Sequence, residues 1–295
     1  MLGKLFKYEI RSISKVGLLL VAIAGIITAI GAVYLVSPLF KSLIDPRGAK
    51  ETSTVVFGSI LGMLGILSYI LMLFALTTGF SIYAGFRFYK SMYSDEGYLT
   101  HTLPVTPSQL LFVKIVTASV WVLIMYAVLT LSALFLVTLG VAEITHSDIP
   151  TLLKNVKSGI EFILDYISKD LKVAIAKSSV YWIIALIITP IANICILFGA
   201  LTVGQCSWKN KGLMGIVSYI GIRVAMSVIS GVANLAGNIV FAARSSADVE
   251  DEVAAMYALG LANSKYLVAM SITLVFAVGL TIVSNYIIKN RLNLE

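Results

Sequence analysis

Few residues in this sequence have the types and spacing that chemistry requires. The chain contains two histidines, His101 and His146, and two cysteines, Cys195 and Cys206, and their spacing fits neither a metal site nor a disulfide framework. The sequence has no G-x-S-x-G nucleophile elbow, no H-E-x-x-H zinc motif and no G-x-x-x-x-G-K-[ST] phosphate-binding loop. We therefore expect a protein that is not an enzyme, with no catalytic residues, no metal site and no cofactor of its own.

The composition indicates a membrane protein. Of the 295 residues, 59% are hydrophobic and only 13% are charged, whereas soluble domains have about 25% charged residues. A chain with so few charges cannot cover a surface that faces water, which excludes a soluble enzyme, a disordered regulator and a secreted disulfide scaffold. The net charge of +7 does not indicate nucleic-acid binding, because the basic residues flank apolar runs.

Six apolar runs are long enough to cross a bilayer, since a spanning helix needs ~20 such residues. They cover residues 16–40, 52–86, 115–142, 178–208, 212–243 and 266–288. The sequence thus predicts an all-α membrane protein with six transmembrane helices and both termini on one side. Basic residues crowd the short ends of the runs, which by the positive-inside rule favours a cell-membrane protein with both termini cytoplasmic; these residues are Lys4, Lys7, Arg11, Lys15, Lys209, Lys211, Lys289 and Arg291.

Three segments outside the runs are expected to be helical. Residues 1–15 form an amphipathic basic stretch, predicted to be a helix in the membrane interface, although an ordinary positive flank would have the same charges. Residues 16–295 form the six-span domain, in which 143–177 is an outer helical insertion with Pro150 in a first turn. Residues 245–263 are expected to form a short outer helix before the last span.

The apolar runs contain no Asp, Glu or His, and Arg223 is their only charge. Arg223 marks either a path for an anionic group or a side chain that reaches back to the headgroups. Asn234 and Asn238 are expected either to line a polar route with Arg223 or to form hydrogen bonds between neighbouring helices. Gly58 and Gly62 form a G-x-x-x-G pair that favours close helix packing.

The connection between the second and third runs, 87–114, is the only long cytoplasmic one. Asp95, Glu96 and Gly97 turn the chain, and a short helix over 98–103 is stopped by Pro104. Thr106 or Ser108 can cap the next helix, with Pro107 in its first turn. We expect a stiff elbow that exposes an apolar-aromatic surface to a cytoplasmic partner; its residues are Tyr98, Leu99, His101 and Leu103.

The segment 96–114 resembles the membrane subunits of ABC-2-type ATP-binding-cassette transporters. It has the acid, the glycine, the Leu-Pro-Val-Thr core and the closing lysine of that family; the matching residues are Glu96, Gly97, Leu99, Leu103, Pro104, Val105, Thr106, Leu110 and Lys114. The family's usual Gly-Thr-Leu reads Gly97-Tyr98-Leu99 here. The six-span plan also fits, and the larger segment 143–177 is similar to that of a Gram-positive branch linked to peptide-antibiotic or drug export.

The resemblance implies that the elbow is a coupling helix seated in a separate ATPase subunit, which would hold ATP and Mg²⁺. The implied docking residues are Asp95, Glu96, Gly97, Tyr98, Leu99, His101, Leu103, Pro104, Val105 and Thr106. It further implies a dimer with a second permease copy or a homologous permease, membrane lipids as surroundings, and export of a peptide, drug-like or lipidic substrate. The alternative is a membrane scaffold or sensor that binds another cytoplasmic protein through residues 95–107.

Overall fold

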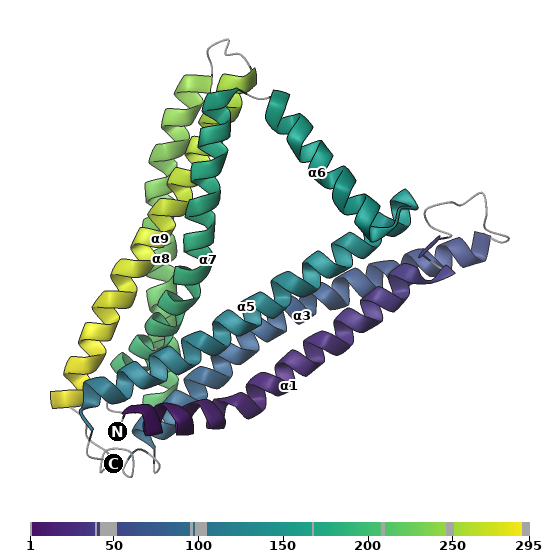
Figure 1. Cartoon of the computed structure of the whole chain (residues 1–295). Helices are drawn as coiled ribbons and strands as arrows, with labels where there is room; N and C mark the ends of the chain where they lie inside the picture. The colour runs from purple at the N-terminus through teal and green to yellow at the C-terminus, as the bar shows by residue number, and fades with distance from the viewer. Residues whose placement is uncertain are drawn as a thin grey trace. The chain divides into compact units, whose positions relative to one another are not determined.

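The computed structural model describes residues 2–38, 40–41, 52–94, 97, 105–166, 168–207, 210–245 and 251–290. The secondary structure of this part of the chain is helical (Figure 1). Its helices are α1 (Leu2–Val36), α3 (Thr52–Tyr93), α5 (Pro107–Thr145), α6 (Ile149–Tyr166), α7 (Lys169–Gly204), α8 (Lys211–Ser245) and α9 (Asp251–Asn290). Among these described helices, 6 are long and apolar enough to cross a membrane. The prediction of an all-α membrane protein with six spans is confirmed.

Most helices extend beyond the apolar runs at one or both ends. Residues 2–15, predicted to lie in the membrane interface, are the start of α1, which continues without a break to Val36. Residues 251–263, expected to belong to a separate outer helix, are the first turns of α9. A lack of charge marks the part of a helix that lipid can surround, whereas backbone hydrogen bonding continues through charged residues that are good helix formers. Most span limits read from charge therefore fall at or inside the helix ends, whereas the runs 16–40 and 178–208 extend past the ends of α1 at Val36 and of α7 at Gly204.

The end of α5 and the start of α6 are each determined by a few neighbouring residues. His146 adopts a left-handed backbone (φ 49), and the Ser147 N–H donates to the Ala142 carbonyl over 3.1 Å, which is the helix-ending pattern of a Schellman motif. Pro150 then lies in the first turn of α6, where its missing N–H costs nothing. Of the predicted insertion 143–177, residues 149–166 form a separate helix, whereas residues 169–177 are the first turns of the long helix α7. His146 ends α5 in this arrangement.

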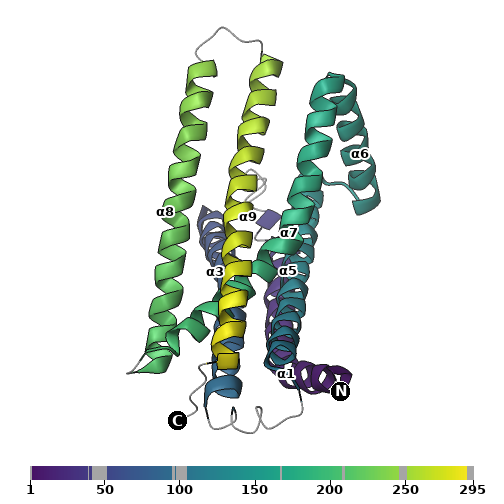
Figure 2. The ribbon, with the colours of Figure 1, turned by 90° about the vertical axis from the view of Figure 1, so that its left-hand side faces the viewer.

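The described residues form two compact units. The first comprises Met1–Ile10, Tyr83–Val120 and Leu164–Glu295, and the second Arg11–Ile82 and Trp121–Ile163. In the first unit, α7, α8 and α9 pack together (Figure 2) around the buried side chains of Ala192, Ile196, Met226 and Ala277. In the second unit, α1, α3 and α5 pack around Ala24, Met72, Leu76 and Leu129.

A close approach of two glycines joins α7 to α8 in the first unit. A β-carbon on Gly204 would overlap the backbone of Gly215. Small residues at such a crossing let two membrane helices come into backbone contact. The end of α7 and the start of α8 are therefore in direct backbone contact.

Candidate functional site

The structure describes both ends of the predicted coupling region. Gly97, Val105 and Thr106 are described, together with α3 up to Tyr93 and α5 from Pro107. The other predicted docking residues lie outside the described residues; they are Asp95, Glu96, Tyr98, Leu99, His101, Leu103 and Pro104. The described part of the site therefore consists of the end of α3 with Gly97 and the start of α5 with Val105 and Thr106.

Gly97 lies directly against the end of α3. Its N–H donates a 2.6 Å hydrogen bond to the Ser94 carbonyl, and a β-carbon on Gly97 would come within 2.6 Å of the Met92 carbonyl oxygen. A side chain at position 97 would therefore force the backbone of this turn to shift. Glycine allows the close approach of the turn to the end of α3.

Thr106 caps α5 on the other side of the connection. The Thr106 hydroxyl accepts a hydrogen bond from the Gln109 N–H at 3.4 Å, and the Gln109 side-chain oxygen accepts one from the Thr106 N–H at 3.2 Å. Pro107 is the first helical residue. This reciprocal arrangement is a capping box, so of the two predicted caps, Thr106 and Ser108, the structure selects Thr106.

Four polar side chains meet within the first unit, and we call them the Lys114 cluster: Glu9, Arg87, Ser91 and Lys114. The Lys114 ammonium donates to the Ser91 hydroxyl at 2.6 Å and to the Glu9 carboxylate at 3.3 Å. The Arg87 Nε atom lies 3.8 Å from the same Glu9 oxygen. Lys114 is only 5% exposed. Burying its positive charge costs free energy, which these contacts offset.

The Lys114 cluster joins three helices next to the connection. Glu9 comes from α1, Arg87 and Ser91 lie one turn apart on α3, and Lys114 comes from the first turns of α5. An edge-to-face contact of Phe6 with Phe112, with centroids 6.5 Å apart, adds to the α1–α5 contact. Displacing one of these helix ends would therefore separate charged groups that are buried together.

Sequence reasoning named Lys114 only through the family resemblance and did not include its partners. Two signals were present. Glu9 is the only acid among residues 1–15, and Arg87 and Ser91 have the one-turn spacing of side chains on one helix face. Neither signal identifies Lys114 as the partner, because that contact depends on three helices meeting.

An aromatic contact fixes the end of α3 to α7. The rings of Phe88 and Phe198 stack with centroids 4.1 Å apart and an interplanar angle of 6°. The Tyr93 hydroxyl donates to the Thr202 hydroxyl at 2.8 Å, and Thr202 in turn donates to the Phe198 carbonyl at 2.8 Å. Both Thr202 and Met92 are fully buried, so the last turn of α3 is held in a packed polar and aromatic contact.

The candidate pathway residues lie on α8. The Arg223 Nε atom donates to the Tyr219 hydroxyl at 3.0 Å, and its guanidinium carbon lies 5.3 Å from the centroid of the Tyr219 ring. The Asn234 amide donates to the Ser230 hydroxyl at 3.4 Å, and Asn238 is exposed.

The G-x-x-x-G pair faces α1 in the second unit. The Tyr34 hydroxyl donates to the Gly58 carbonyl at 2.8 Å. A β-carbon on Gly62 would lie 2.5 Å from the same hydroxyl oxygen. Both glycines therefore make room for a tyrosine of the neighbouring helix.

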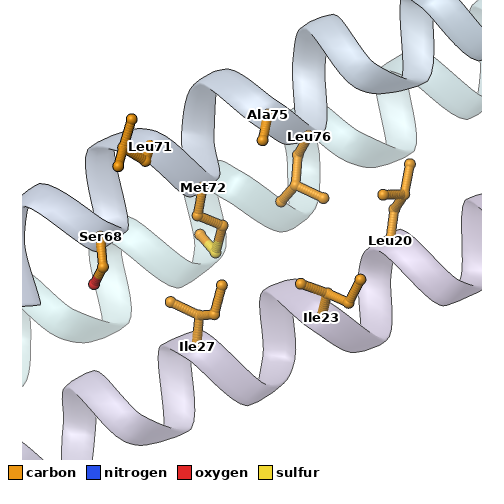
Figure 3. A pocket seen from close by; sticks show the side chains of 8 residues that line it. All are labelled: Leu20, Ile23, Ile27, Ser68, Leu71, Met72, Ala75 and Leu76. Carbon is orange, nitrogen blue, oxygen red and sulfur yellow. The ribbon is translucent and has the colours of Figure 1, made fainter.

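An apolar cavity of about 360 Å³ also lies between α1 and α3 in the second unit (Figure 3). Its lining is aliphatic apart from Ser68 and the thioether of Met72, and the Ser68 hydroxyl donates to its own helix at the Gly65 carbonyl. Such a lining offers contact to a hydrocarbon chain and no site for proton transfer or metal binding.

Comparisons with known proteins give no relative for this chain: no family model, no curated protein and no solved structure matches it.

Proposed function

We propose that this chain is the transmembrane subunit of an ATP-driven exporter, in the cell membrane with both termini cytoplasmic. The proposal is supported by the six long apolar helices and by the resemblance of residues 96–114 to ABC-2-type membrane subunits. A separate ATPase subunit, holding ATP and Mg²⁺, supplies the energy. A second permease subunit completes the transporter, and its cargo is a peptide, a drug-like molecule or a lipidic molecule.

The observation that carries the proposal is the firm attachment of both ends of the 94–106 connection. On the α3 side, Tyr93 is bonded to Thr202 and Phe88 stacks on Phe198. On the α5 side, the capping box ends at Thr106, and Lys114 is tied to α1 and α3.

Firmly packed ends allow the connection to transmit a displacement. If its ends were loosely packed, movement of a bound partner would change only the connection, whereas packed ends transmit the movement to α3 and α5. Packed contacts shift between discrete arrangements rather than deforming continuously. ATP-driven closure of a docked ATPase would in this way move α1, α3 and α5 together at their cytoplasmic ends.

Co-purification of the full-length chain from its native membrane tests the proposal. We expect an ATPase with a phosphate-binding loop to come down with the wild type and to be lost with Leu99→Asp, because a buried apolar contact is replaced by a charge. The matched control is Leu153→Asp on α6, which introduces the same change at an exposed leucine (56%) of the outer insertion. Membrane fractionation checks that both variants insert.

Two outcomes would contradict the proposal. Equal recovery of the ATPase with Leu99→Asp and with wild type would remove the elbow as its docking element. Recovery of a partner without ATPase activity, lost in Leu99→Asp, would favour the scaffold or sensor instead.

A further inference from the structure

One face of α1 changes from basic to aliphatic along its length. Arg11 and Lys15 lie one turn apart, and Leu18 and Leu19 follow in the next turn. At 100° per residue these four positions fall within an arc of about 100°, which we call the Arg11 face. All four side chains are exposed, so the Arg11 face is open to the surroundings of the helix.

The opposite side of α1 is packed within the second unit. Ile13 is 4% exposed and Ala24 is 1% exposed, and Ala24 belongs to the core formed with α3 and α5. A β-carbon on Gly17 would overlap the Trp121 ring. Around the helix, these positions of α1 lie about 200° to 240° from Arg11. The Arg11 face therefore points away from the core of this unit.

The aliphatic part of the Arg11 face continues along the span. Ile26 and Val33 lie in the same arc, at about 60° and 40° from Arg11, and are 61% and 72% exposed. An exposed aliphatic surface on a helix that can cross a membrane suits the acyl chains of a bilayer. Arg11 and Lys15 therefore lie at the end of a surface suited to lipid.

In the part of the chain that the structure describes, no ion pair balances the charges of Arg11 and Lys15. Glu9 is the only acid among residues 1–44. It lies about 160° from Arg11 around α1, and its carboxylate contacts Lys114 instead. Because two like charges one turn apart on a helix repel each other, an anion bound between Arg11 and Lys15 would stabilise both.

The level of these two cations along α1 matches that of phospholipid head groups. At 1.5 Å per residue, Lys15 precedes Leu18 by about 5 Å along the helix axis, and Arg11 precedes it by about 10 Å. The polar layer on each side of a bilayer is about 5 to 8 Å thick. With Leu18 at the edge of the hydrocarbon, Lys15 lies inside this layer and Arg11 lies at its outer boundary.

A phospholipid supplies both kinds of group that the Arg11 face can bind. Its phosphate accepts charge-assisted hydrogen bonds from the guanidinium of Arg11 and the ammonium of Lys15. Its acyl chains cover the aliphatic side chains that follow, beginning with Leu18 and Leu19. A symmetric second copy of the chain would instead bring four cations together, because each copy presents the same surface to the other.

We propose that the Arg11 face binds an anionic phospholipid of the surrounding bilayer, with the phosphate held between Arg11 and Lys15. This lipid site goes beyond the proposed export function and does not depend on it, since the site requires only that α1 crosses a bilayer.

Native mass spectrometry of the full-length chain, purified without an ATPase, tests the site. The protein is released from nanodiscs with equal amounts of phosphatidylglycerol and phosphatidylcholine, and the retained lipids are identified and counted. The variants are Arg11→Gln, Lys15→Gln and the double variant. The matched control, Lys4→Gln/Lys7→Gln, removes two exposed cations from the same side of α1, further from the apolar run. Membrane fractionation checks that each variant inserts.

We expect the wild type and Lys4→Gln/Lys7→Gln to retain phosphatidylglycerol in preference to phosphatidylcholine. The preference should fall about fivefold in each single variant and further in the double variant, because each cation near an anionic head group contributes a factor of about five. The single variants each keep one cation at the start of the span, so they test the site even where the double variant inserts poorly.

Three results would overturn the inference. An equal preference in wild type and in the variants of Arg11 and Lys15 would mean that this pair holds no lipid. An equal loss in Lys4→Gln/Lys7→Gln would mean that any cation near the start of α1 has the same effect. A loss of dimer in the Arg11 and Lys15 variants, with unchanged lipid retention, would mean that a second copy covers the face.

The two proposals fail separately. Because no ATPase is present in the lipid experiment, its outcome does not affect the co-purification test of the proposed function. Equally, failure to recover an ATPase would leave the retention of phosphatidylglycerol at Arg11 and Lys15 unchanged.

Discussion

Lys114 donates a 2.6 Å hydrogen bond from its ammonium group to the hydroxyl oxygen of Ser91. The two residues lie on opposite sides of the 94–106 connection, Ser91 near the end of α3 and Lys114 near the start of α5. The bond therefore joins the end of α3 to the start of α5. A Glu9 carboxylate oxygen of α1 lies 3.3 Å from the same ammonium nitrogen, so α1 is joined to both. On the proposed function, the helices that a docked ATPase would displace are therefore already bonded to each other.

Lys114→Met should lower the free energy of unfolding by about 3 kcal/mol, since it leaves the partly buried Glu9 carboxylate without its closest cation. Thermal denaturation of the purified chain in detergent, followed by size-exclusion chromatography, measures the loss. The control is the double variant Glu9→Gln/Lys114→Met, which removes both charges and should recover part of the stability. A single variant as stable as wild type would show that the pair contributes nothing.

Tyr93→Phe should cost about 1 kcal/mol, because it removes one buried hydrogen bond and leaves the ring packing in place. A double-mutant cycle with Thr202→Val isolates the Tyr93–Thr202 interaction, and we expect a coupling of about 1 kcal/mol. Thr202→Ser, which keeps the hydroxyl, serves as the control. Strictly additive effects of the two single changes would argue against this bond.

Gly97→Ala should displace the turn at the end of α3, because its methyl group would meet the Met92 carbonyl oxygen at 2.6 Å. On the proposed function, this reduces the ATPase recovered in co-purification about fivefold, equivalent to about 1 kcal/mol. Gly79→Ala, within α3, is the control for adding a methyl group, since a β-carbon there meets no atom within 4 Å. Equal recovery from the two variants would mean that the geometry of this turn does not matter for docking.

Gly62→Ala and Gly65→Ala should change stability in opposite directions. The first forces the Tyr34 hydroxyl away from its 2.8 Å bond to the Gly58 carbonyl and should cost about 1 kcal/mol. The second adds a methyl group in open space and should stabilise α3 by up to about 1 kcal/mol through helix propensity. Melting midpoints of the two variants in the same detergent decide the matter, and a loss of stability in both would point to lipid contact rather than to Tyr34.

Sequence reasoning recovered those features of the fold that depend on local chemistry. The spans follow from charge-free runs, and the end of α3 follows from the turn assigned to residues 95–97. The start of α5 follows from Pro107 with Thr106 or Ser108 as the cap, because caps and turns are decided within a few residues. The limits of α1 and α9 were less accurate, since charged residues continue a helix beyond the hydrocarbon. The docking role of Leu99 and His101 remains a prediction, as both lie outside the described residues.

The partners of Lys114 could not be predicted in the same way. Glu9 and Lys114 are 105 positions apart, and Tyr93 and Thr202 are 109 apart. Each pair forms only when helices distant in the chain pack side by side, so no local pattern specifies which cation meets which carboxylate.

The amino-acid sequence alone was sufficient to establish a helical membrane protein, because the transfer of each side chain between water and lipid depends on its own chemistry. Tertiary structure was needed to show that Glu9, Arg87, Ser91 and Lys114 form one cluster near the end of α3 and the start of α5. The physical reason is that a buried ion pair is stable only at contact distance, and only the packing of α1, α3 and α5 sets that distance.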